Sequence, residues 1–168
     1  TTQTIDGIDF PAFAHLPSSL RDMFGQIRQA QGDNCFLVYQ DERYSFEQTF
    51  TKADAFALAL TEKYGIGKGD KVALVMRNYP EWIYSFIAIT SIGAIAVPLN
   101  SWWQGKELDY GISHSEAKVF IGDQERLQSL EGLSKDIPRI SVRTKGKKYE
   151  NTIAFEDVVE PKDHFPQT

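Results

Sequence analysis

Apolar positions are densest between Asp70 and Asn100, and this stretch organises the predicted fold. The run Trp82–Leu99 carries no formal charge, which approaches the length of about 20 residues that a membrane-spanning helix needs. Gly93 and Pro98 interrupt the run, and β-branched residues crowd its end, as expected where a buried helix leads into a buried strand. The pattern therefore predicts no transmembrane segment here.

The same stretch divides into a strand, a helix and a second strand. Lys71–Met76 is a short apolar run that predicts a buried strand, Glu81–Ile92 predicts a helix, and Ala94–Leu99 predicts another strand. This order is a crossover between parallel strands, and strands that are apolar on both faces belong to sheets covered on both sides. The predicted fold class is α/β, with a mostly parallel sheet and helices on both faces.

The pattern before this unit is less regular. Residues 1–17 have no period and are expected to form an irregular arm. A surface helix with one apolar stripe is predicted to begin at Ser18 or Ser19 and to end at Gly32.

A small N-terminal hairpin and a long helix come next. Cys35–Tyr39 and Tyr44–Phe46 are β-rich and flank a polar turn, as in a hairpin. Ser45 and Gln48 have the spacing of a capping box, in which each side chain bonds the other residue's backbone N–H. They begin a predicted helix of about five turns that Gly65 ends.

After the crossover, helices and strands alternate. Each is read from apolar residues at helical spacing or from a short β-rich run. The expected helices are Lys106–Ser115, Asp123–Leu133 and Ile153–Val159, and the expected strands are Lys118–Ile121 and Ile137–Val142. Residues 160–168 are expected to form a linker-like tail, so that residues 1–168 form a single α/β subdomain.

Composition narrows the function classes. The chain has 168 residues, 24% charged and 42% hydrophobic, which suits one globular domain. The net charge of −5 argues against nucleic-acid binding, and the cluster Lys145, Lys147 and Lys148 is expected to be a solvated turn. Cys35 is the only cysteine, so no internal disulfide can form, and a cytoplasmic location is expected. No secretory signal is expected, and because the first residue is Thr1 instead of methionine, trimming or processing is expected.

No local motif predicts a catalytic, cofactor-binding or metal-ligating residue. Gly65–Asp70 combines glycines with a lysine, but a phosphate loop runs from a strand into a helix, and here a helix leads into a strand. His114 lies at a helix end, where a cation is favourable without any catalytic role. Because ligands bind at the carboxyl ends of parallel strands, the loops Arg77–Tyr79 and Asn100–Trp103 are the best placed for a ligand or a neighbouring domain.

Three blocks in order resemble a known family. The segments Tyr44–Leu60, Gly65–Asn100 and Lys106–Ile121 are similar to the N-terminal portion of the adenylate-forming acyl-CoA synthetases. Within the second block, Gly93–Asn100 (GAIAVPLN) is similar to the family's Gly-Ala-Val-Pro-Leu-Asn block. The likeness covers about residues 18–160 and implies that the chain is the N-terminal fragment of a larger ligase.

The resemblance implies a chemistry and a set of partners. The full enzyme would activate a carboxylic acid with Mg-ATP to an acyl adenylate and transfer the acyl group to CoA. The family's phosphate loop, later aspartates and C-terminal lysine are not in this chain, so the fragment alone is expected to be inactive, with no ATP, CoA or Mg bound. Its expected partners are the remainder of the ligase and the carboxylic acid substrate, and a homodimer stays open. The expected wall residues of the acyl and pantetheine channels are Tyr79, Trp82, Trp102 and Trp103.

Two alternatives from other classes stay open. One is a non-catalytic α/β interaction domain that uses Trp102 and Trp103 as a protein-binding anchor. A weaker one is a membrane-associated protein built on Trp82–Leu99.

Overall fold

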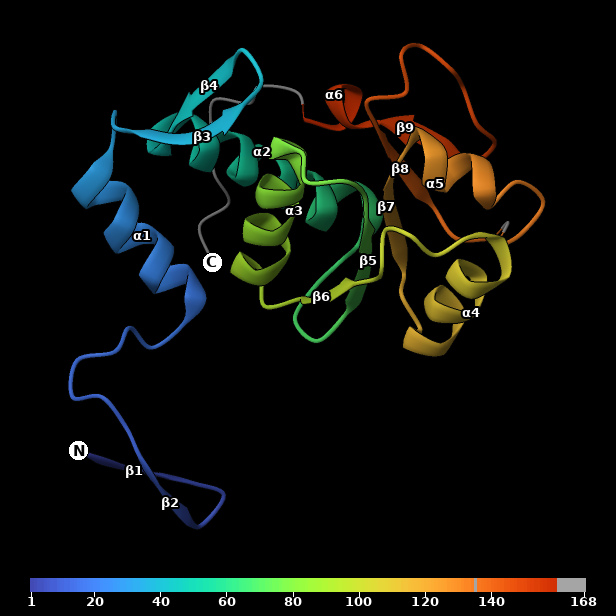
Figure 1. The fold of residues 1–168 in the computed structure, drawn as a ribbon. Helices are drawn as coiled ribbons and strands as arrows, with labels where there is room; N and C mark the ends of the chain where they lie inside the picture. The colour runs from blue at the N-terminus through green and yellow to red at the C-terminus, as the bar shows by residue number, and fades with distance from the viewer. Residues whose placement is uncertain (135, 160–168) are drawn as a thin grey trace.

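The computed structural model describes residues 1–134 and 136–159. Its centre is a sheet in the order β6-β5-β7-β8-β9, in which each neighbouring pair is parallel. Helices lie on both sides of this sheet (Figure 1), which confirms the predicted α/β class. The strands are β5 (Lys71–Val75), β6 (Ile95–Pro98), β7 (Val119–Asp123), β8 (Arg139–Val142) and β9 (Thr152–Ala154).

Side chains that alternate along the strands give the sheet two buried faces. On β5, Val72 and Leu74 belong to one apolar cluster, whereas Ala73 and Val75 belong to the other. Both clusters are closed by helices. The first is covered by α2 (Phe46–Tyr64), α3 (Pro80–Ser91) and α6 (Phe155–Val158), and the second by α4 (Gly105–Ser115) and α5 (Gln124–Ser129).

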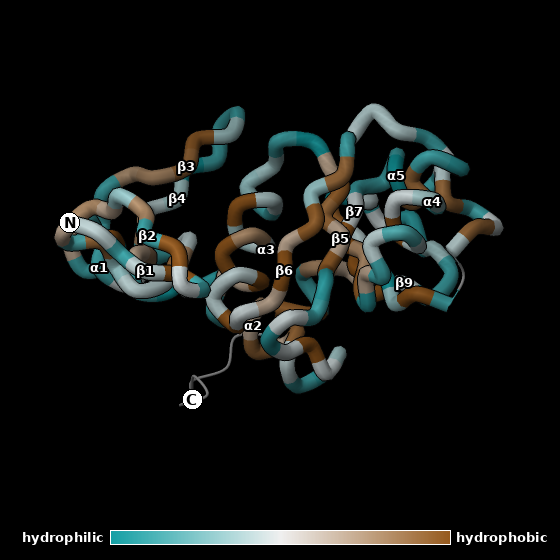
Figure 2. The backbone as a smooth tube through the Cα atoms, turned by 90° about the horizontal axis from the view of Figure 1, so that it is seen from below, coloured by the Kyte–Doolittle hydropathy of each residue, from teal (hydrophilic) through white to brown (hydrophobic). Residues whose placement is uncertain are grey.

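The uncharged run folds as a crossover. α3 buries seven of its twelve residues, and Gly93, with φ of +76°, turns the chain towards β6. β5 and β6 then pair in parallel, with Val72 opposite Ala96. Figure 2 shows hydrophobic residues along α3 and the adjacent strands. Among the described residues, no helix combines the length and apolarity that a membrane span needs.

The predicted hairpin and capping box are both present. The hairpin consists of β3 (Cys35–Tyr39) and β4 (Glu42–Ser45), which pair antiparallel. The Ser45 hydroxyl accepts from the Gln48 N–H at 3.1 Å, and the Gln48 side chain accepts from the Ser45 N–H at 2.9 Å. α1 (Leu20–Gln31) precedes the hairpin and packs against α2 and α3.

The prediction of an irregular arm at residues 1–17 is wrong for residues 2–11, whereas residues 12–17 contain no helix or strand. β1 (Thr2–Ile5) and β2 (Ile8–Pro11) form an antiparallel hairpin that projects away from the sheet (Figure 1). Asp6 and Gly7 join them with φ of +50° and +80°, the conformation of the tightest hairpin turns, and Asp-Gly is a strong signal for such turns. The strands are exposed on both faces, and the alternation of Ile8, Asp9 and Phe10 is too short to predict a strand by itself.

Two predicted helices near the C-terminus are also wrong in their extent. Of the predicted helix Ile153–Val159, the first part is strand β9, because the free edge of β8 offers backbone groups for parallel pairing. The predicted helix Asp123–Leu133 is reduced to α5: Asp123 ends β7 and caps the helix by accepting from the Arg126 N–H, and the helix ends at Ser129, before a turn in which Gly132 has φ of +80°. The predicted tail at residues 160–168 lies outside the described residues.

Helix α3 begins without a side-chain cap. Tyr79 holds the N-cap position and makes no side-chain capping bond. Pro80 follows in the first turn, where its missing N–H costs no hydrogen bond.

Candidate functional site

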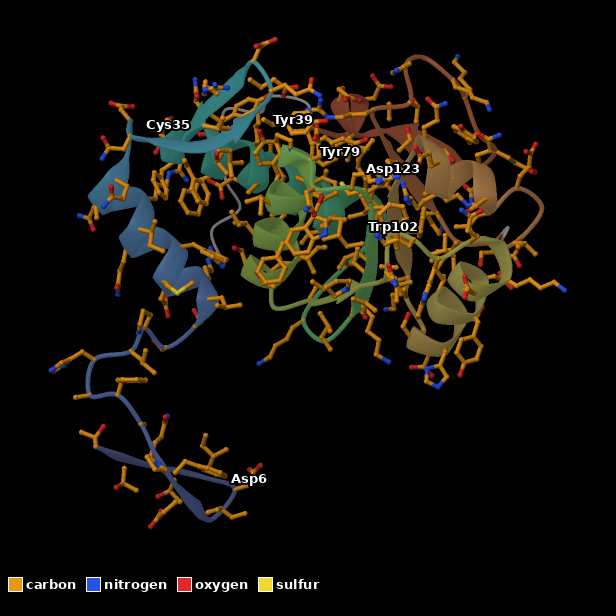
Figure 3. The ribbon with its side chains drawn as sticks, viewed as in Figure 1. Asp6, Cys35, Tyr39, Tyr79, Trp102 and Asp123 are labelled. Atoms are coloured by element: carbon orange, nitrogen blue, oxygen red, sulfur yellow. The ribbon has the colours of Figure 1, made fainter. Side chains whose placement is uncertain are left out.

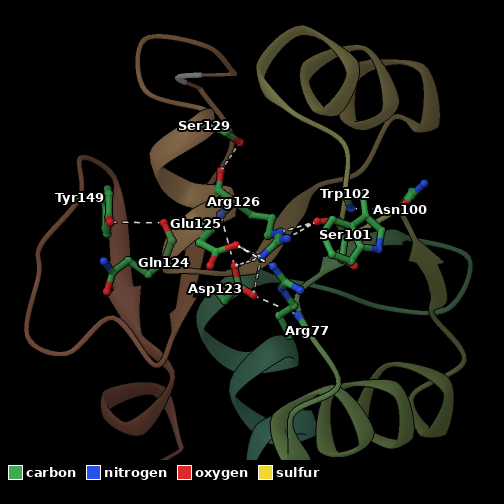
Figure 4. A network of polar contacts seen from close by, with 10 residues as sticks. All are labelled: Arg77, Asn100, Ser101, Trp102, Asp123, Gln124, Glu125, Arg126, Ser129 and Tyr149. Carbon is green, nitrogen blue, oxygen red and sulfur yellow. Dashed lines mark hydrogen bonds and ion pairs between the residues drawn. The ribbon is translucent and has the colours of Figure 1, made fainter.

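The loops after the parallel strands meet at one edge of the sheet, as this topology requires. Arg77–Tyr79 follows β5, Asn100–Trp103 follows β6, Asp123 ends β7, and Arg143 follows β8. Figure 4 shows part of this carboxyl edge from close by. Two groups of contacts organise it, one around Asp123 and one around Arg143.

Asp123 ties three of these loops together. Its carboxylate accepts from the Arg77 backbone N–H at 3.0 Å and from Arg126 Nη1 at 3.1 and 3.2 Å (Figure 4). Arg126 also donates from Nε to the Ser101 carbonyl at 2.6 Å. The Asp123 and Arg126 side chains are only 4% and 6% exposed. This buried pair therefore fixes the ends of β5, β6 and β7 relative to one another.

The two adjacent tryptophans divide between solvent and core. Trp102 is 70% exposed, and the Arg77 guanidinium lies 4.5 Å from its ring centroid. Arg77 also donates to Glu125 at 3.2 Å, and this contact lowers the pKa of that carboxyl. Trp103 instead packs into the second core cluster. Its ring lies against Gly111, and a Cβ added to that glycine would lie 3.0 Å from the Trp103 ring.

A groove opens beside Tyr79, between the β3–β4 hairpin and the start of α3. Its volume is about 290 Å³. The Tyr39 and Tyr79 rings meet edge to face at 5.6 Å (Figure 3), and the Arg143 guanidinium lies over both rings at this end of the groove. Burial raises the pKa of Tyr79, so its phenol stays neutral. The lining residues are Leu37, Val38, Tyr39, Asn78, Tyr79, Pro80, Trp82 and Ile83.

Arg143 joins the hairpin, the helix and the sheet. Its guanidinium donates to both carboxylate oxygens of Glu42, each at 2.8 Å, and to Glu81 at 3.0 and 3.1 Å. It also lies 4.8 Å from the Tyr39 ring and 5.2 Å from the Tyr79 ring. The bonds from Arg143, followed by the bond from Tyr44, lower the pKa of Glu42 to about 2.

The structure separates the four predicted wall residues. Tyr79 and Trp82 line the same groove, and Trp82 stacks on Phe86 with ring centroids 5.5 Å apart. Trp102 and Trp103 are not among the residues that line it. Their role as channel walls stays a prediction.

Sequence reasoning missed Arg143 and Glu42. They lie 101 positions apart, and neither belongs to a local motif. The available signal was the position of Arg143 directly after a predicted strand, the same rule that pointed to Arg77.

A larger groove of about 770 Å³ lies between α1, α2 and α3. Its walls include Phe24, Phe50 and Ile87. Two cations, Arg21 and Arg28, lie on its rim, and Arg28 is paired with Glu47 and Asp54. This groove lies away from the carboxyl edge and brings no convergent set of strand-end groups together.

The described residues do not fit a nucleotide's phosphates at the glycine segment. The Gly67 N–H donates to the Asp70 carboxylate at 2.9 Å, and Asp70 also pairs with Lys118 at 2.6 Å. A carboxylate therefore holds the position that a phosphate would need. In the described part of the chain, no group of three or more His, Cys, Asp or Glu side chains could hold a metal ion. His114 stacks on Tyr110, with centroids 5.2 Å apart.

Comparison with known proteins gives consistent results. The chain is 34% identical over 98 residues to 4-hydroxybutyrate–CoA ligase 2 of Metallosphaera sedula, covering 58% of this chain and 18% of that enzyme. It is 27% identical over 113 residues to the medium/long-chain-fatty-acid–CoA ligase FadD6 of Mycobacterium tuberculosis, covering 67% and 19%. The chain thus spans about a fifth of the length of these relatives.

Solved structures agree with these relatives. The anthranilate CoA ligase AuaEII, in complex with anthranoyl-AMP, superposes with a TM-score of 0.78 at 25% identity, over 86% of this chain and 28% of that one. Coronafacic acid ligase from Pectobacterium brasiliense shares the fold, with a TM-score of 0.77 at 23% identity over 89% and 31%. A model of the family described as AMP-binding enzyme matches residues 24–167. The chain therefore belongs to the AMP-binding enzyme family.

Proposed function

We propose that the chain is the N-terminal part of an AMP-forming acid–thiol ligase. The complete enzyme would join a carboxylic acid to CoA and convert ATP to AMP and diphosphate. The observation that carries this proposal is the family match over residues 24–167 on a sheet of the same fold. The names of the similar enzymes specify a hydroxy acid, a fatty acid and an aryl acid, so the class of acid stays open.

The described residues act as a scaffold and a wall in this proposal. Asp123 and Arg126 hold the strand ends, while Tyr79 and Trp82 offer an apolar surface to the acyl or pantetheine chain. ATP, Mg and CoA would be held by residues of the complete ligase outside this chain, because the glycine segment is closed by Asp70. Residues 1–168 alone would then bind none of them and make no acyl adenylate. The single cysteine favours a cytoplasmic enzyme.

The test uses the full product of the gene that encodes this chain. It is incubated with ATP, Mg, CoA and a panel of aliphatic, hydroxy and aryl acids, and acyl-CoA is measured by mass spectrometry. We expect at least one acid to give acyl-CoA and AMP. A Tyr79→Ala variant should raise the KM for that acid or for CoA, whereas His114→Ala, at an exposed helix end, should leave both unchanged. Failure of every acid and thiol would contradict the proposal.

A second candidate is a non-catalytic interaction domain. The exposure of Trp102, at 70%, favours it, since large exposed aromatics mark binding surfaces. A gene that encodes no further ligase residues would support this candidate against the first.

A further inference from the structure

We propose that Arg143 is a positioning residue for the groove between the β3–β4 hairpin and α3. Together with Glu42, Glu81, Tyr39 and Tyr79 it forms a unit that we term the Arg143 clamp. The clamp holds the tip of the hairpin against α3, so that the two tyrosines form one end of a site for an uncharged aliphatic or aromatic part of a ligand. Only the identity of the ligand rests on the proposed function.

The geometry of Arg143 is that of a three-way junction. Both terminal nitrogens reach Glu42 on the hairpin, each at 2.8 Å, while Nε reaches Glu81 in the first turn of α3 at 3.0 and 3.1 Å. The planar guanidinium suits this arrangement, because its fork of donors matches a carboxylate while its faces stack on aromatic rings. Lysine could not make all these contacts at once.

The clamp is partly withdrawn from water. Side-chain exposure is 26% for Arg143, 34% for Glu42 and 12% for Glu81. Arg143 also has φ of +52°, a left-handed conformation that residues other than glycine seldom adopt. Such a backbone conformation persists where the surroundings require it, and here it directs the side chain between the hairpin and α3.

The clamp acts on the free end of the hairpin. The base of the hairpin has a contact outside the clamp, because Phe36 stacks on Phe46 at 4.2 Å. Tyr44 also packs edge to face on Tyr84 at 5.8 Å, while its hydroxyl donates to Glu42 at 2.7 Å. The tip of the hairpin includes the exposed turn at Gln40 and Asp41. Loss of Arg143 should therefore release the tip and leave the base in place.

The lining defines the chemistry of the ligand. Among the described residues that line the groove, none carries a charged side chain. Its volume of about 290 Å³ lies just below the range of roughly 300–1,000 Å³ that is usual for small-molecule sites. The groove therefore suits one aromatic ring or a short alkyl segment, with the rest of the ligand outside.

Hydrogen exchange of residues 1–168, measured by mass spectrometry, tests the clamp without any catalysis. The variants are Arg143→Met and Glu42→Gln, with Lys148→Met as the control that removes a nearby exposed cation. We expect exchange at residues 37–43 to rise about tenfold in both variants, with no change in β5 and β7. Arg143→Lys should restore protection only in part. Unchanged exchange at the tip, in a variant whose β5 and β7 stay protected, would overturn the clamp.

The same measurement with N-phenyl-1-naphthylamine, a neutral aromatic probe, tests the groove. The probe should protect residues 37–39 and 78–83 in the wild type and in Lys148→Met, and about tenfold more probe should be needed in Arg143→Met. Protection confined to α1 and α2 would place the probe in the larger groove and overturn this site. Failure of the complete protein to make acyl-CoA would contradict the proposed function alone, because neither exchange result depends on turnover.

Discussion

Ion pairs in this chain contribute unequally to the free energy of unfolding, and their burial accounts for the difference. The Asp123–Arg126 pair is nearly enclosed, whereas in the Lys71–Glu116 pair the glutamate is 78% exposed. A buried charge left without its partner costs far more than a solvated one, because water cannot replace the lost contact. Removal of a carboxylate should therefore cost much more free energy of unfolding at Asp123 than at Glu116.

Asp123→Ala should destabilise the chain by about 3–5 kcal/mol, because it leaves Arg126 without its buried carboxylate and removes the cap of α5. Urea denaturation measures this change in the free energy of unfolding. Glu116→Gln is the control, and we expect no measurable loss from it. Equal effects of the two substitutions would contradict the importance given to burial.

The pH dependence of stability should report on Glu42. Its pKa falls from 4.5 to about 2 on folding, and it is surrounded by Arg143, Tyr44, Tyr84 and, across the guanidinium, Glu81. Between these values the unfolded chain binds more protons than the folded chain, so this stability is complete above about pH 4.5 and is lost as the pH falls towards 2.

The difference in urea midpoint between the wild type and Glu42→Gln isolates this group, because the other carboxyls titrate in both proteins. The difference should be largest near neutral pH and should shrink steadily below pH 4.5. A difference that stays constant down to pH 2 would show that the ionised Glu42 carboxylate does not stabilise the folded chain.

Two glycines should respond in opposite directions to an added methyl group. At Gly122 in β7, a Cβ would lie 2.5 Å from the buried ring of Phe120 and 3.2 Å from the Val75 carbonyl oxygen. At Gly25 inside α1, nothing lies within 4 Å. Gly122→Ala should cost about 1–3 kcal/mol by overpacking, and Gly25→Ala should add about 0.5–1 kcal/mol through helix propensity. Thermal and urea unfolding check both signs.

At the scale of elements, the start of α2 depends on its capping box. Ser45→Ala removes the acceptor for the Gln48 N–H and should cost about 1 kcal/mol, within the usual range of 0.5–2. Ser113→Ala, at an exposed position inside α4, is the matched control and should be close to neutral. A loss of stability as large in the control would mean that the cap is not the cause.

Elements with a strong local pattern could be predicted from the sequence. The helix with Ser45 at its cap and the crossover around Glu81–Ile92 both have an apolar period and a clear boundary residue. The hairpin at residues 2–11 and the strand Thr152–Ala154 lack such a pattern. The former is exposed on both faces, and the latter becomes a strand because it pairs with β8, a contact that local propensity does not contain.

The site was predictable only as far as topology fixes it. The rule that strand ends gather ligand groups located Arg77–Tyr79 and Asn100–Trp103 correctly at one edge. It could not tell that Trp103 turns inward while Trp102 stays exposed, because that choice depends on the space beside Gly111. Nor could the rule predict the contact between Arg143 and Glu42, because the whole fold is needed to bring these two distant positions together.

At the scale of the molecule, the chain is a parallel sheet covered by helices, and its carboxyl edge holds buried and partly buried ion pairs next to aromatic side chains. At the glycine segment the Gly67 N–H donates to the Asp70 carboxylate, and the matched CoA ligases are about five times longer than the aligned region. The proposed division of labour follows from this: the chain shapes the edge, and the rest of the ligase supplies the reacting groups.

The exchange of radiolabelled pyrophosphate into ATP tests this division most directly, because it reports acyl-adenylate formation alone. Residues 1–168 and the full gene product are assayed side by side with Mg and the panel of acids. The account predicts acid-dependent exchange by the full product and none by residues 1–168. Acid-dependent exchange by residues 1–168 alone, or its absence from the full product with every acid, would contradict it.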